Sequence, residues 1–550
     1  LFYGIETLNE APVSTGEVSS VCYAAHQCLP GSLFVAIAGT AHDGHDYISQ
    51  AIERGARYIV HQKDIAVPEG IVALHVADSR RALGMIAKNF YRTPSEGLTL
   101  IGVTGTSGKT TICYLLESIL KAAGFRPGVI GTVNYRYDDV VLPAPNTTPE
   151  SLEMQKILRE MADAGVTHVV CEVSSHALDL KRVDDCDFDV GIFTNLSPEH
   201  LDYHKDLEDY FRAKKRFFTD ILPASKKTGV RKTVVNMDDP WGRRLLKEVK
   251  MKALTYGLEG DAQITARSDE ISLDGISANI FLDGDSICVS SKLIGRFNLS
   301  NMLAAAAAAS LACVSPAQIA SGISSLSRVP GRMERVDSPS GIHVFVDYAH
   351  KPDALRQALQ SLVLLKQKRI ITVFGCGGNR DRAKRPLMGQ VATGLGDLTI
   401  VTSDNPRRED PEVIIAEIEA GIDRGTIMKI GPESAPAPQG VNSYMVIADR
   451  KAAIERAIAT AGAGDIVLIA GKGHEDYQIL KTGKIPFDDR VVAAAALQAR
   501  FPTAQAGEPV FLVSEAVDVT GGKLAAGRSG DMFKGISTDT RALRPGNLFV

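Results

Sequence analysis

One ten-residue stretch, GVTGTSGKTT at 102–111, carries the strongest chemical signal in this 550-residue sequence. It follows the apolar run TLI, which is typical of a buried strand, and it leads into a helical pattern. Gly105 and Gly108 allow backbone N–H groups to turn toward a phosphate, and the start of the helix adds partial positive charge. Lys109 can neutralise the β- and γ-phosphates, and the Thr110 hydroxyl can ligate Mg²⁺. The alternative is a tight strand–helix turn with a surface lysine, but the combination of features favours a nucleoside triphosphate site.

Carboxylates and histidines follow two later apolar strands and are candidates for a magnesium site. Nucleotide-bound Mg²⁺ requires oxygen ligands in nearly octahedral geometry, usually one or two carboxylates with water. Glu172, in CEVSSH, ends one strand, where it could equally be a solvated carboxylate. The segment FTNLSPEHLDYH ends the other strand and supplies Glu199, His200, Asp202 and His204. A histidine in such a loop is more often hydrogen-bonded than a ligand, so spacing alone leaves both interpretations open.

The composition is ordinary for a globular protein. Hydrophobic residues make up 45% and charged residues 23% of the chain, and the formal net charge is −4. We therefore expect neither a nucleic-acid nor an anionic-membrane surface. No apolar run reaches the ~18–20 residues that a membrane-spanning helix needs. The eight cysteines are scattered, without a C-x-x-C pair or zinc-ligand spacing. This pattern favours reduced thiols and a cytoplasmic location.

Short apolar runs alternate with helical patterns along the chain, which predicts an α/β protein with mostly parallel, helix-covered sheets. The chain is long enough for several domains, each with its own core. The alanine-rich run GRFNLSNMLAAAAAASLA predicts a helix, because alanine loses the least entropy in one. The segments YRTPSEG, VPGRMERV and AQAGEP are typical of linkers. We therefore predict four segments, at residues 1–95, 96–330, 331–505 and 508–550.

Ten motifs then occur in order between about residues 15 and 500: GTSGKTT, NTTPES, EVSSHALDLKRV, NLSPEHLDYHKDLEDYFRAKKRFF, GRFNLSNMLAA, VPGRMERV, VDYAHKPDAL, FGCGGNRDRAKRP, DNPR and AGKGHEDYQ. Together they resemble the Mur ligases, and most closely the members that add the third residue of the bacterial cell-wall peptide. That family uses the shorter loop G-T-x-G-K-[ST]. This accounts for Val103, which stands where the general phosphate-loop pattern has its first glycine.

The resemblance implies a three-domain Mur ligase architecture. A small α/β N-terminal domain would bind the UDP-sugar, a central P-loop domain with a mostly parallel sheet would bind ATP, and a Rossmann-like C-terminal domain would bind the amino acid. It also implies an ATP- and Mg²⁺-dependent ligase of peptidoglycan synthesis. In the reaction that the resemblance implies, the carboxylate of UDP-MurNAc-L-Ala-D-Glu becomes an acyl phosphate, the amine of meso-diaminopimelate attacks it, and phosphate leaves. A monomer without nucleic-acid or membrane partners is expected.

The catalytic residues implied by the resemblance are Lys109, Glu172, His200 and Lys214. Lys214 lies in RAKKRFF, residues 212–218, which taken alone indicates the solvated basic face of a helix. In the family this lysine is carbamylated, and the carbamate could hold magnesium together with Thr110, Glu172 and His200. Carbon dioxide adds only to a neutral amine, so burial and nearby cations must favour loss of the proton.

Further contacts follow from the same resemblance. The implied ATP-binding residues are Gly105, Thr106, Ser107, Gly108, Lys109, Thr110, Thr111, Asn298, Asn301, Arg332 and Asp347. Those implied for the nucleotide-linked peptide are Thr147, Thr148, Ser174 and Arg182. The chain departs from the family at Leu180, where some relatives have glutamine. It also departs at Ala24, Ala25 and His26, where relatives have Asp-Ser/Thr-Arg, so the uridine end must be held differently from the family pattern.

The amino acid added is expected to be meso-diaminopimelate. Asp404, Asn405, Pro406 and Arg407 follow the strand DLTIVTS. Gly471 ends DIVLIAG and Glu475 follows it, so both groups can face one pocket. Diaminopimelate differs from lysine by a second head with a carboxylate beside an ammonium. Arg407 with Arg380 could bind that carboxylate, and Glu475 the ammonium. In the family, DNPR marks diaminopimelate-adding enzymes. An Asn-Pro turn with a surface arginine is the alternative.

Three other functions stay open on the sequence alone: an L-lysine-adding homologue, a folylpolyglutamate synthetase-like ligase, and an ATP-binding module without catalysis. The second shares the phosphate loop and the chemistry, but it is not expected to have DNPR or GKGHE. The altered trio at 24–26 favours the inactive module, whereas the intact Lys109, Glu172, His200 and Lys214 oppose it.

The end of the chain repeats its beginning. RPGNLFV at 544–550 matches PGSLFV at 30–35, and Asp539, Thr540 and Arg541 restore the trio that the first copy lacks. Residues 508–550 resemble the start of a second Mur ligase, the one that adds D-Ala-D-Ala. We therefore expect a fragment of a fusion, whose lone strands are poorly ordered because a partial sheet buries little apolar surface. The alternative is a C-terminal extension that packs on the body.

Overall fold

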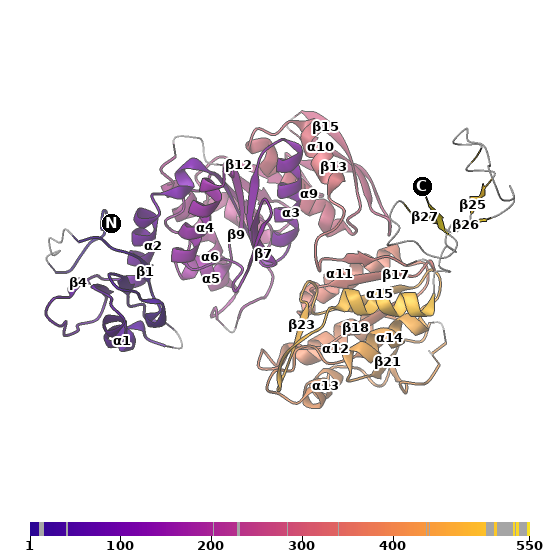
Figure 1. Ribbon diagram of the computed structural model, residues 1–550. Coiled ribbons are helices and arrows are strands. Elements are labelled where there is room, and N and C mark those ends of the chain that lie inside the picture. Colours follow the sequence, from indigo (N-terminus) through magenta and orange to yellow (C-terminus); the bar gives the residue numbers. More distant parts are fainter. Residues whose placement is uncertain are drawn as a thin grey trace.

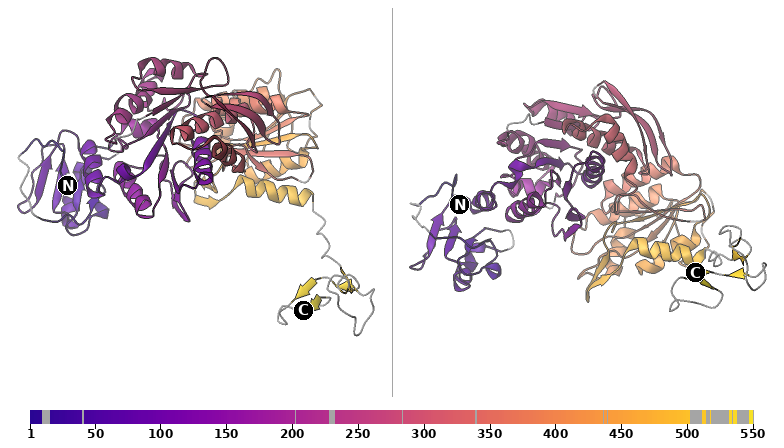
Figure 2. Two further views of the ribbon diagram at one scale, coloured as in Figure 1. Left: turned by 90° about the horizontal axis from the view of Figure 1, so that it is seen from above. Right: turned by 45° about the horizontal axis from the view of Figure 1, so that its top comes forward.

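The computed structural model describes most of the chain. The described residues are 1–9, 16–39, 42–201, 203–227, 232–282, 284–338, 340–435, 437–438 and 440–501, with 511–513, 517, 532–533, 535–537 and 547–549 beyond them. Figures 1 and 2 show three units in chain order, with the N-terminal unit at one end and the C-terminal unit on the other side of the central one. Within the described part of the chain, no helix has both the length and the apolar character needed to cross a bilayer.

The N-terminal unit is built on a small parallel sheet in the order β1-β2-β3-β4. Its elements are β1 (Val21–Cys22), η1 (Ala25–Gln27), β2 (Leu33–Val35), η2 (Gly44–Tyr47), α1 (Ile48–Glu53), β3 (Tyr58–His61), β4 (Val72–His75) and α2 (Ser79–Phe90). Apolar residues of the strands pack against the buried face of α2, and α2 also lies against α4 of the central unit.

The central unit contains an eight-stranded sheet in the order β12-β11-β10-β5-β9-β6-β7-β8, parallel except at the β6–β7 and β7–β8 pairs. Its strands are β5 (Thr99–Thr104), β6 (Pro127–Ile130), β7 (Asn134–Tyr137), β8 (Val140–Pro143), β9 (His168–Glu172), β10 (Val190–Phe193), β11 (Lys232–Asn236) and β12 (Ala253–Tyr256). The helices up to the end of this sheet are η3 (Pro94–Gly97), α3 (Lys109–Ala122), α4 (Ser151–Asp163), α5 (Ser175–Asp179), α6 (Leu207–Arg216), the π-helical η4 (Phe217–Ile221), α7 (Leu222–Ala224) and α8 (Pro240–Glu248). Because β10, β5 and β9 are neighbours, the loops after them lie at one carboxyl edge, where ligands of open α/β sheets bind.

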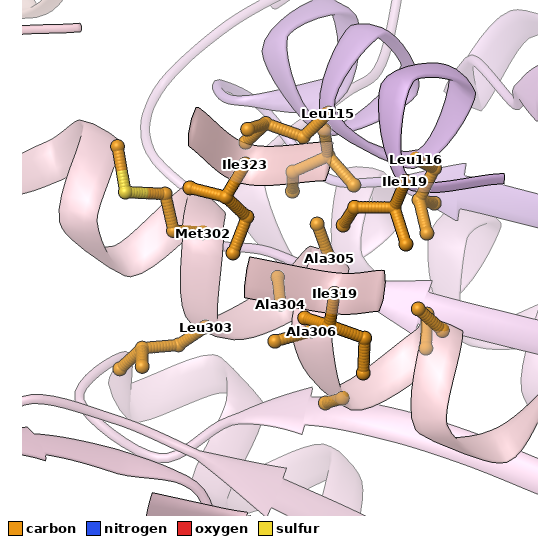
Figure 3. Packing of buried hydrophobic residues seen from close by; sticks show 14 of the residues in the cluster. Leu115, Leu116, Ile119, Met302, Leu303, Ala304, Ala305, Ala306, Ile319 and Ile323 are labelled. Atoms are coloured by element: carbon orange, nitrogen blue, oxygen red, sulfur yellow. The ribbon is translucent and has the colours of Figure 1, made fainter. Parts of the chain in front are cut away.

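A second, antiparallel sheet and two helices complete the central unit. They are β13 (Thr265–Ile271), β14 (Ile276–Leu282), β15 (Asp285–Ser291), α9 (Arg296–Leu311) and α10 (Pro316–Ser325). The predicted alanine-rich helix is α9, and Ala304–Ala309 are completely buried. Figure 3 shows α9 packed with leucine and isoleucine side chains of α3 and α10. A Cβ at Gly322 of α10 would lie 2.3 Å from the Cα of Ile119, so small residues permit this close helix packing.

The C-terminal unit contains a seven-stranded sheet in the order β16-β17-β22-β18-β19-β21-β20, parallel except at the β16–β17 edge. Its strands are β16 (Glu334–Val336), β17 (His343–Asp347), β18 (Ile370–Phe374), β19 (Leu398–Val401), β20 (Met428–Lys429), β21 (Ser443–Val446) and β22 (Ile466–Ala470), followed by the hairpin β23 (Tyr477–Leu480) and β24 (Gly483–Pro486). Its helices are α11 (Pro352–Leu365), α12 (Lys384–Leu395), α13 (Pro411–Glu419), α14 (Arg450–Thr460) and α15 (Asp489–Arg500). The predicted α/β class with mostly parallel sheets is confirmed, while the predicted domain limits stay predictions.

The described residues of the tail include the short strands β25 (Phe511–Leu512), β26 (Met532–Phe533), β27 (Gly535–Ser537) and β28 (Asn547–Phe549). Strands β27 and β28 are parallel, with Ile536 opposite Leu548. Strands β1 and β2 are also parallel, with Val21 opposite Leu33, so the pairing register of the repeat equals that of the first copy. The trio Asp539–Arg541 lies outside the described residues, as does most of 508–550.

Candidate active site

The loop between β5 and α3 has a shape that requires glycine at two positions. Gly105 and Gly108 have φ angles of 144° and 90°. A Cβ would lie 1.8 Å from Thr194 Oγ1 at the first position and 2.4 Å from Asn301 Oδ1 at the second. These contacts leave no room for a side chain, so the backbone is held close to its neighbours as a phosphate-binding turn requires.

Residues after β10 hold this loop in place. The N–H of Ser107 donates to Asn195 Oδ1 at 2.9 Å, and the N–H of Thr106 donates to the Asn195 carbonyl at 2.9 Å. Thr194 Oγ1 donates to the Ser107 carbonyl at 2.7 Å. The loop is therefore braced by side chains and backbone of the neighbouring strand end, which limits its rearrangement when a ligand binds.

Two lysines lie at the loop. Lys109 Nζ donates to the carbonyls of Gly105 and Thr106, each at 2.9 Å. Lys214 Nζ donates to the same Gly105 carbonyl at 2.9 Å, and it lies 4.5 Å from the centre of the Tyr210 ring. Only 1% of the Lys214 surface is exposed, and it forms no ion pair with any carboxylate of the described residues. Burial, and then the charge of Lys109, lower the pKa of Lys214 well below its usual value.

The burial of Lys214 corrects one interpretation of RAKKRFF. Lys214 is not on a solvated face, whereas its neighbours Lys215 and Arg216 do form ion pairs with Glu248 and Asp184. Between residues 207 and 218, the buried residues are Tyr210, Phe211, Lys214, Phe217 and Phe218. Lys214 therefore occupies the apolar stripe, because it falls at helical spacing from these aromatic residues.

Glu172, at the end of β9, is 1% exposed and belongs to a hydrogen-bond network. Its Oε1 accepts from the N–H of Thr132 and its Oε2 from the Thr132 hydroxyl, each at 2.9 Å. The hydroxyls of Thr132 and Thr147 share a hydrogen bond of 3.1 Å. The alternative of a solvated strand-end carboxylate is therefore wrong, and the carboxylate is fixed in orientation.

The loop after β10 reaches across to the C-terminal unit. His200 has a φ of 56°, and its Nε2 lies 3.1 Å from Glu199 Oε1. Glu199 also forms an ion pair with Lys351, which immediately precedes α11. His204 is buried and its Nε2 lies 3.0 Å from the hydroxyl of Ser175, which indicates a structural role. Asp202 lies outside the described residues.

A cavity of about 300 Å³ lies between the central and C-terminal units. The phosphate loop, Glu172 and His200 line one side, and residues 347–351 line the other. Arg332 Nη2 donates to Thr110 Oγ1 at 3.2 Å, so a cationic side chain of the C-terminal unit contacts the start of α3. Asp347 accepts from the N–H groups of Met333 and Ala349 at 2.7 and 2.8 Å, and burial raises its pKa. A cation of each unit, Lys109 and Arg332, therefore lines the cavity.

The predicted adenine-side asparagines differ in position. Asn301 lines the cavity, whereas Asn298 is 1% exposed and does not. Asn298 Nδ2 donates to the Ile294 carbonyl at 2.8 Å, and its Oδ1 accepts from Asn301 Nδ2 at 3.1 Å. Asn298 thus positions Asn301.

The oxygen atoms at the loop suit magnesium. Among the described residues, no three His, Cys, Asp or Glu side chains are grouped closely enough to hold a metal by themselves. The Thr110 hydroxyl and the Glu172 carboxylate nevertheless line one cavity. One carboxylate and one hydroxyl, with water and nucleotide oxygens, form the kind of ligand set that Mg²⁺ takes.

Comparison with known proteins decides the family. Models described as "Mur ligase family, catalytic domain", "Mur ligase middle domain" and "Mur ligase, glutamate ligase domain" match residues 17–91, 103–309 and 331–473. A protein from Geobacter metallireducens named UDP-N-acetylmuramoyl-L-alanyl-D-glutamate–2,6-diaminopimelate ligase is 46% identical over 482 residues, covering 88% of this chain and 94% of the relative. The chain belongs to the Mur ligase family.

Solved structures agree with the fold of this Mur ligase. A structure of a UDP-N-acetylmuramoyl-L-alanyl-D-glutamate–2,6-diaminopimelate ligase matches with a TM-score of 0.65 and 32% identity, covering 91% of this chain and 98% of the other. The MurF ligase from Thermotoga maritima in complex with ADP matches with a TM-score of 0.58, 20% identity, and coverage of 88% and 98%. At 20% identity, the similarity to the MurF ligase concerns the fold alone.

The residues predicted for the nucleotide-linked peptide form one group in this Mur ligase. Thr148 Oγ1 donates to the Glu172 carbonyl at 2.7 Å and accepts from the N–H of Ser174 at 3.1 Å. Arg182 Nη1 donates to the Thr148 carbonyl at 3.1 Å. With Thr147 bonded to Thr132, these side chains continue the network that holds Glu172.

The residues predicted for diaminopimelate converge at two strand ends, after β19 and β22. Asn405 Nδ2 donates to Glu475 Oε2 at 2.8 Å, and a Cβ at Gly471 would lie 2.6 Å from Asp404 Oδ2. Asp404 bonds to the N–H of Asn405 and so supports this turn. Pro406 is buried, and its carbonyl accepts from the N–H of Glu409.

Two arginines border this region. Arg407 Nη1 donates to the Gly378 carbonyl at 2.9 Å and lines a cavity of about 470 Å³ with the β23–β24 hairpin. Arg380 is exposed, and both arginines lie beside Gly377, at 2.9 Å and 3.9 Å from the position of a Cβ there. Both side chains therefore border Gly377, where Arg407 is nearest through its guanidinium and Arg380 through its Cγ atom.

Sequence reasoning missed several contributors. Lys472 is completely buried and its Nζ lies 3.0 Å from Glu475, so Glu475 already has one cationic partner. Thr132 fixes Glu172, and Lys351 joins the two walls of the cavity. Lys351 and Lys472 lie in the quoted motifs VDYAHKPDAL and AGKGHEDYQ, which was a usable signal. Thr132 follows a strand and belongs to no chemical motif, so the sequence gave no signal for it.

Proposed function

We propose that this Mur ligase uses ATP to join meso-diaminopimelate to UDP-MurNAc-L-Ala-D-Glu in peptidoglycan synthesis. The observation that carries the proposal is the 46% identity, over 482 residues, with a relative named as a 2,6-diaminopimelate ligase. Arg407 beside the Asn405–Glu475 pair supports the choice of amino acid, because a second amino-acid head needs both a cation and an anion.

The first step activates the carboxylate. A carboxylate oxygen of the D-glutamyl residue attacks the γ-phosphorus of ATP, the bond to the β-phosphate oxygen breaks, and acyl phosphate and ADP form. Lys109 exchanges its loop carbonyls for phosphate oxygens, and Arg332 adds positive charge from the opposite wall of the cavity. These cations stabilise the charge that the transferring group spreads over its oxygens.

The second step forms the amide. The neutral amine of diaminopimelate attacks the acyl carbon, the bond to the phosphate oxygen breaks, and phosphate leaves, while the amine loses its proton. The diaminopimelate head is bound at Arg407 and Glu475, with the support of Arg380, Asp404, Asn405, Pro406 and Gly471.

Magnesium and a carbamate belong to the same proposal. Thr110, Glu172, His200 and Lys214 as its carbamate would hold Mg²⁺, which when bound neutralises phosphate charge. The support is the buried Lys214 amine, which is drawn toward the neutral, CO₂-reactive form by its low-dielectric surroundings and by Lys109. A cytoplasmic location and a monomeric state, which rest on the use of ATP and on the family, complete the proposal.

The decisive experiment measures phosphate release with UDP-MurNAc-L-Ala-D-Glu and each candidate amine. We expect release that requires both substrates and strongly favours meso-diaminopimelate over L-lysine. Equal turnover would instead indicate a lysine-adding or unselective ligase, and turnover of folate and glutamate would indicate the folylpolyglutamate alternative. Nucleotide binding without any release would indicate an inactive module.

A further inference from the structure

Two cysteines of the N-terminal unit lie next to one another. Cys22 ends β1 and Cys28 follows η1, and their Sγ atoms are 2.9 Å apart. Each side chain is 3% exposed and packs in one apolar cluster with Ala25 and Phe34. A disulfide bond is ~2.05 Å long, so the sulfurs need to approach by only about 1 Å to bond. All eight cysteines of the chain are free.

The two thiols are chemically unequal. The hydrogen bond from Cys22 lowers the pKa of Cys28, and the charge of Arg54 lowers it further, against the effect of burial. The hydrogen bond with Cys28, followed by burial, raises the pKa of Cys22. Burial also raises the pKa of the other enclosed thiols, Cys113, Cys171, Cys186 and Cys376. Because the thiolate is the reactive form, Cys28 is the nucleophile of the pair.

We propose that Cys22 and Cys28 are a hydroperoxide oxidation site at which a reversible disulfide forms. The Cys28 thiolate attacks one peroxide oxygen of H₂O₂, the O–O bond breaks, and a sulfenic acid and hydroxide form. Cys22 sulfur then attacks the Cys28 sulfur, the S–O bond breaks, and the Cys22 proton leaves with the oxygen as water. In total two thiols lose two electrons and two protons, and one peroxide becomes two water molecules.

The surroundings of Cys28 favour a small oxidant. The residues beside Cys28, Gln27 and Leu29, are both exposed, and Leu29 is 60% exposed. Cys28 therefore lies directly beneath the surface, whereas a bulky disulfide reagent would not fit beside a thiol that is 3% exposed. Hydrogen peroxide is the oxidant of suitable size.

The loop between the two cysteines joins two units of the protein. Tyr23 OH donates to Glu153 Oε1 of α4 at 3.2 Å, so this loop contacts the central unit. The loop also contains Ala24, Ala25 and His26, which stand where family members place the trio before the PG-x-LFV strand. A disulfide would draw the end of β1 toward Cys28 and shift these residues. This consequence rests on the proposed function, since it concerns the nucleotide end of that substrate.

The test counts thiols in the full chain. Cys288 and Cys313 are exposed, so both are first replaced by serine, which leaves six cysteines of the eight. After treatment with H₂O₂, quenching, unfolding and alkylation, we expect the loss of two alkylatable thiols. Mass spectrometry should assign the loss to a Cys22–Cys28 link, and dithiothreitol should restore both. Six alkylated thiols, or a loss that maps to other cysteines, would overturn the proposal.

Matched variants sharpen the test. Cys22→Ser should leave a Cys28 sulfenic acid, without a disulfide, that dimedone traps when it is present during unfolding. Cys186→Ser, at a buried cysteine elsewhere, should leave the link intact. In the activity assay, oxidation should raise the KM for the nucleotide-linked peptide and leave the KM for ATP unchanged. An unchanged KM in the oxidised chain would overturn the functional consequence. The thiol count needs no turnover, so it decides the site even if the proposed function fails.

Discussion

Lys109 and Lys214 donate to the same acceptor, since the Nζ atom of each lies 2.9 Å from the Gly105 carbonyl oxygen. Lys109 begins α3 and Lys214 lies near the end of α6, so two helices distant in sequence place their cations at one turn of the phosphate loop. Like charges this close disfavour each other's ionised form, which explains why Lys109 contributes to the lowered pKa of Lys214. The charge state of Lys109 in the loop and that of Lys214 at the candidate carbamate site are therefore coupled.

Lys214→Ala should lose most activity and keep its fold. We expect kcat to fall about 100-fold or more, the effect of removing one preorganised electrostatic group. Acetate or formate should restore part of the rate by supplying an oxygen ligand. Phosphate release and thermal unfolding measure the two effects. Lys215→Ala, at a lysine paired with Glu248, is the matched control and should stay active. Near-normal turnover of Lys214→Ala would refute the role.

Arg407→Ala should weaken recognition of meso-diaminopimelate. A hydrogen bond to a charged group contributes about 1.5–3 kcal/mol, so kcat/KM for this amino acid should fall about tenfold or more. The low rate with L-lysine should not change, because lysine lacks the second carboxylate. Steady-state kinetics with both amino acids test this, with Arg424→Ala, at an exposed arginine outside both cavities, as control. Equal losses for both amino acids would argue against a specificity role.

Thr132→Val should impair catalysis through Glu172. The substitution keeps the backbone donor to Oε1 and removes the hydroxyl donor to Oε2, both at 2.9 Å. Loss of one hydrogen bond to a carboxylate should lower stability by about 1–3 kcal/mol. We expect kcat to change by a larger factor than the KM for ATP. Thr167→Val, at an exposed threonine, is the control variant. A variant that lost stability but kept its kcat would show that Thr132 has only a structural role.

Asp185 should make stability depend on pH. Burial, with Asp184 and Asp187, raises its pKa to about 6, against the opposing charges of Arg81 and Lys88. The folded state then binds more protons than the unfolded state between pH ~4 and ~6, so stability falls as pH rises through this window. Two pKa units correspond to about 3 kcal/mol.

Asp185→Asn removes this titration. The difference in unfolding midpoint, variant minus unmodified chain, should be more positive at pH 8 than at pH 5. Thermal unfolding at both pH values is the measurement, and the exposed Asp139→Asn is the control. An identical difference at the two pH values would contradict the assignment.

Deletion of residues 508–550 should leave diaminopimelate addition unchanged. The described strands of this segment pair only with one another and belong to neither of the large sheets. The cavity residues all precede it. Kinetic constants of the shortened and full chains provide the comparison. A shortened chain without activity would support the alternative of an extension that packs on the body.

Much of the site could be predicted because it depends on local rules. Glycine at positive φ, a following helix start and a lysine define the phosphate loop within ten residues, and the alternation of apolar runs predicts the parallel sheets. The alanine run predicts a helix, though not that residues 301–309 of α9 would be buried on all sides. Placing the strand ends after β19 and β22 in one sheet likewise followed from the rule that parallel strands share a carboxyl edge.

The sequence by itself determined the family, the α/β class and the residue types of the site. Tertiary structure alone decided which groups meet: Lys214 with the Gly105 carbonyl, Thr132 with Glu172, and Cys22 with Cys28. The physical reason is that secondary structure follows from backbone propensity and periodicity over a few residues, whereas these contacts depend on strand order and on packing between elements. A basic helix face and a buried lysine have the same local sequence, and only the surrounding core distinguishes them.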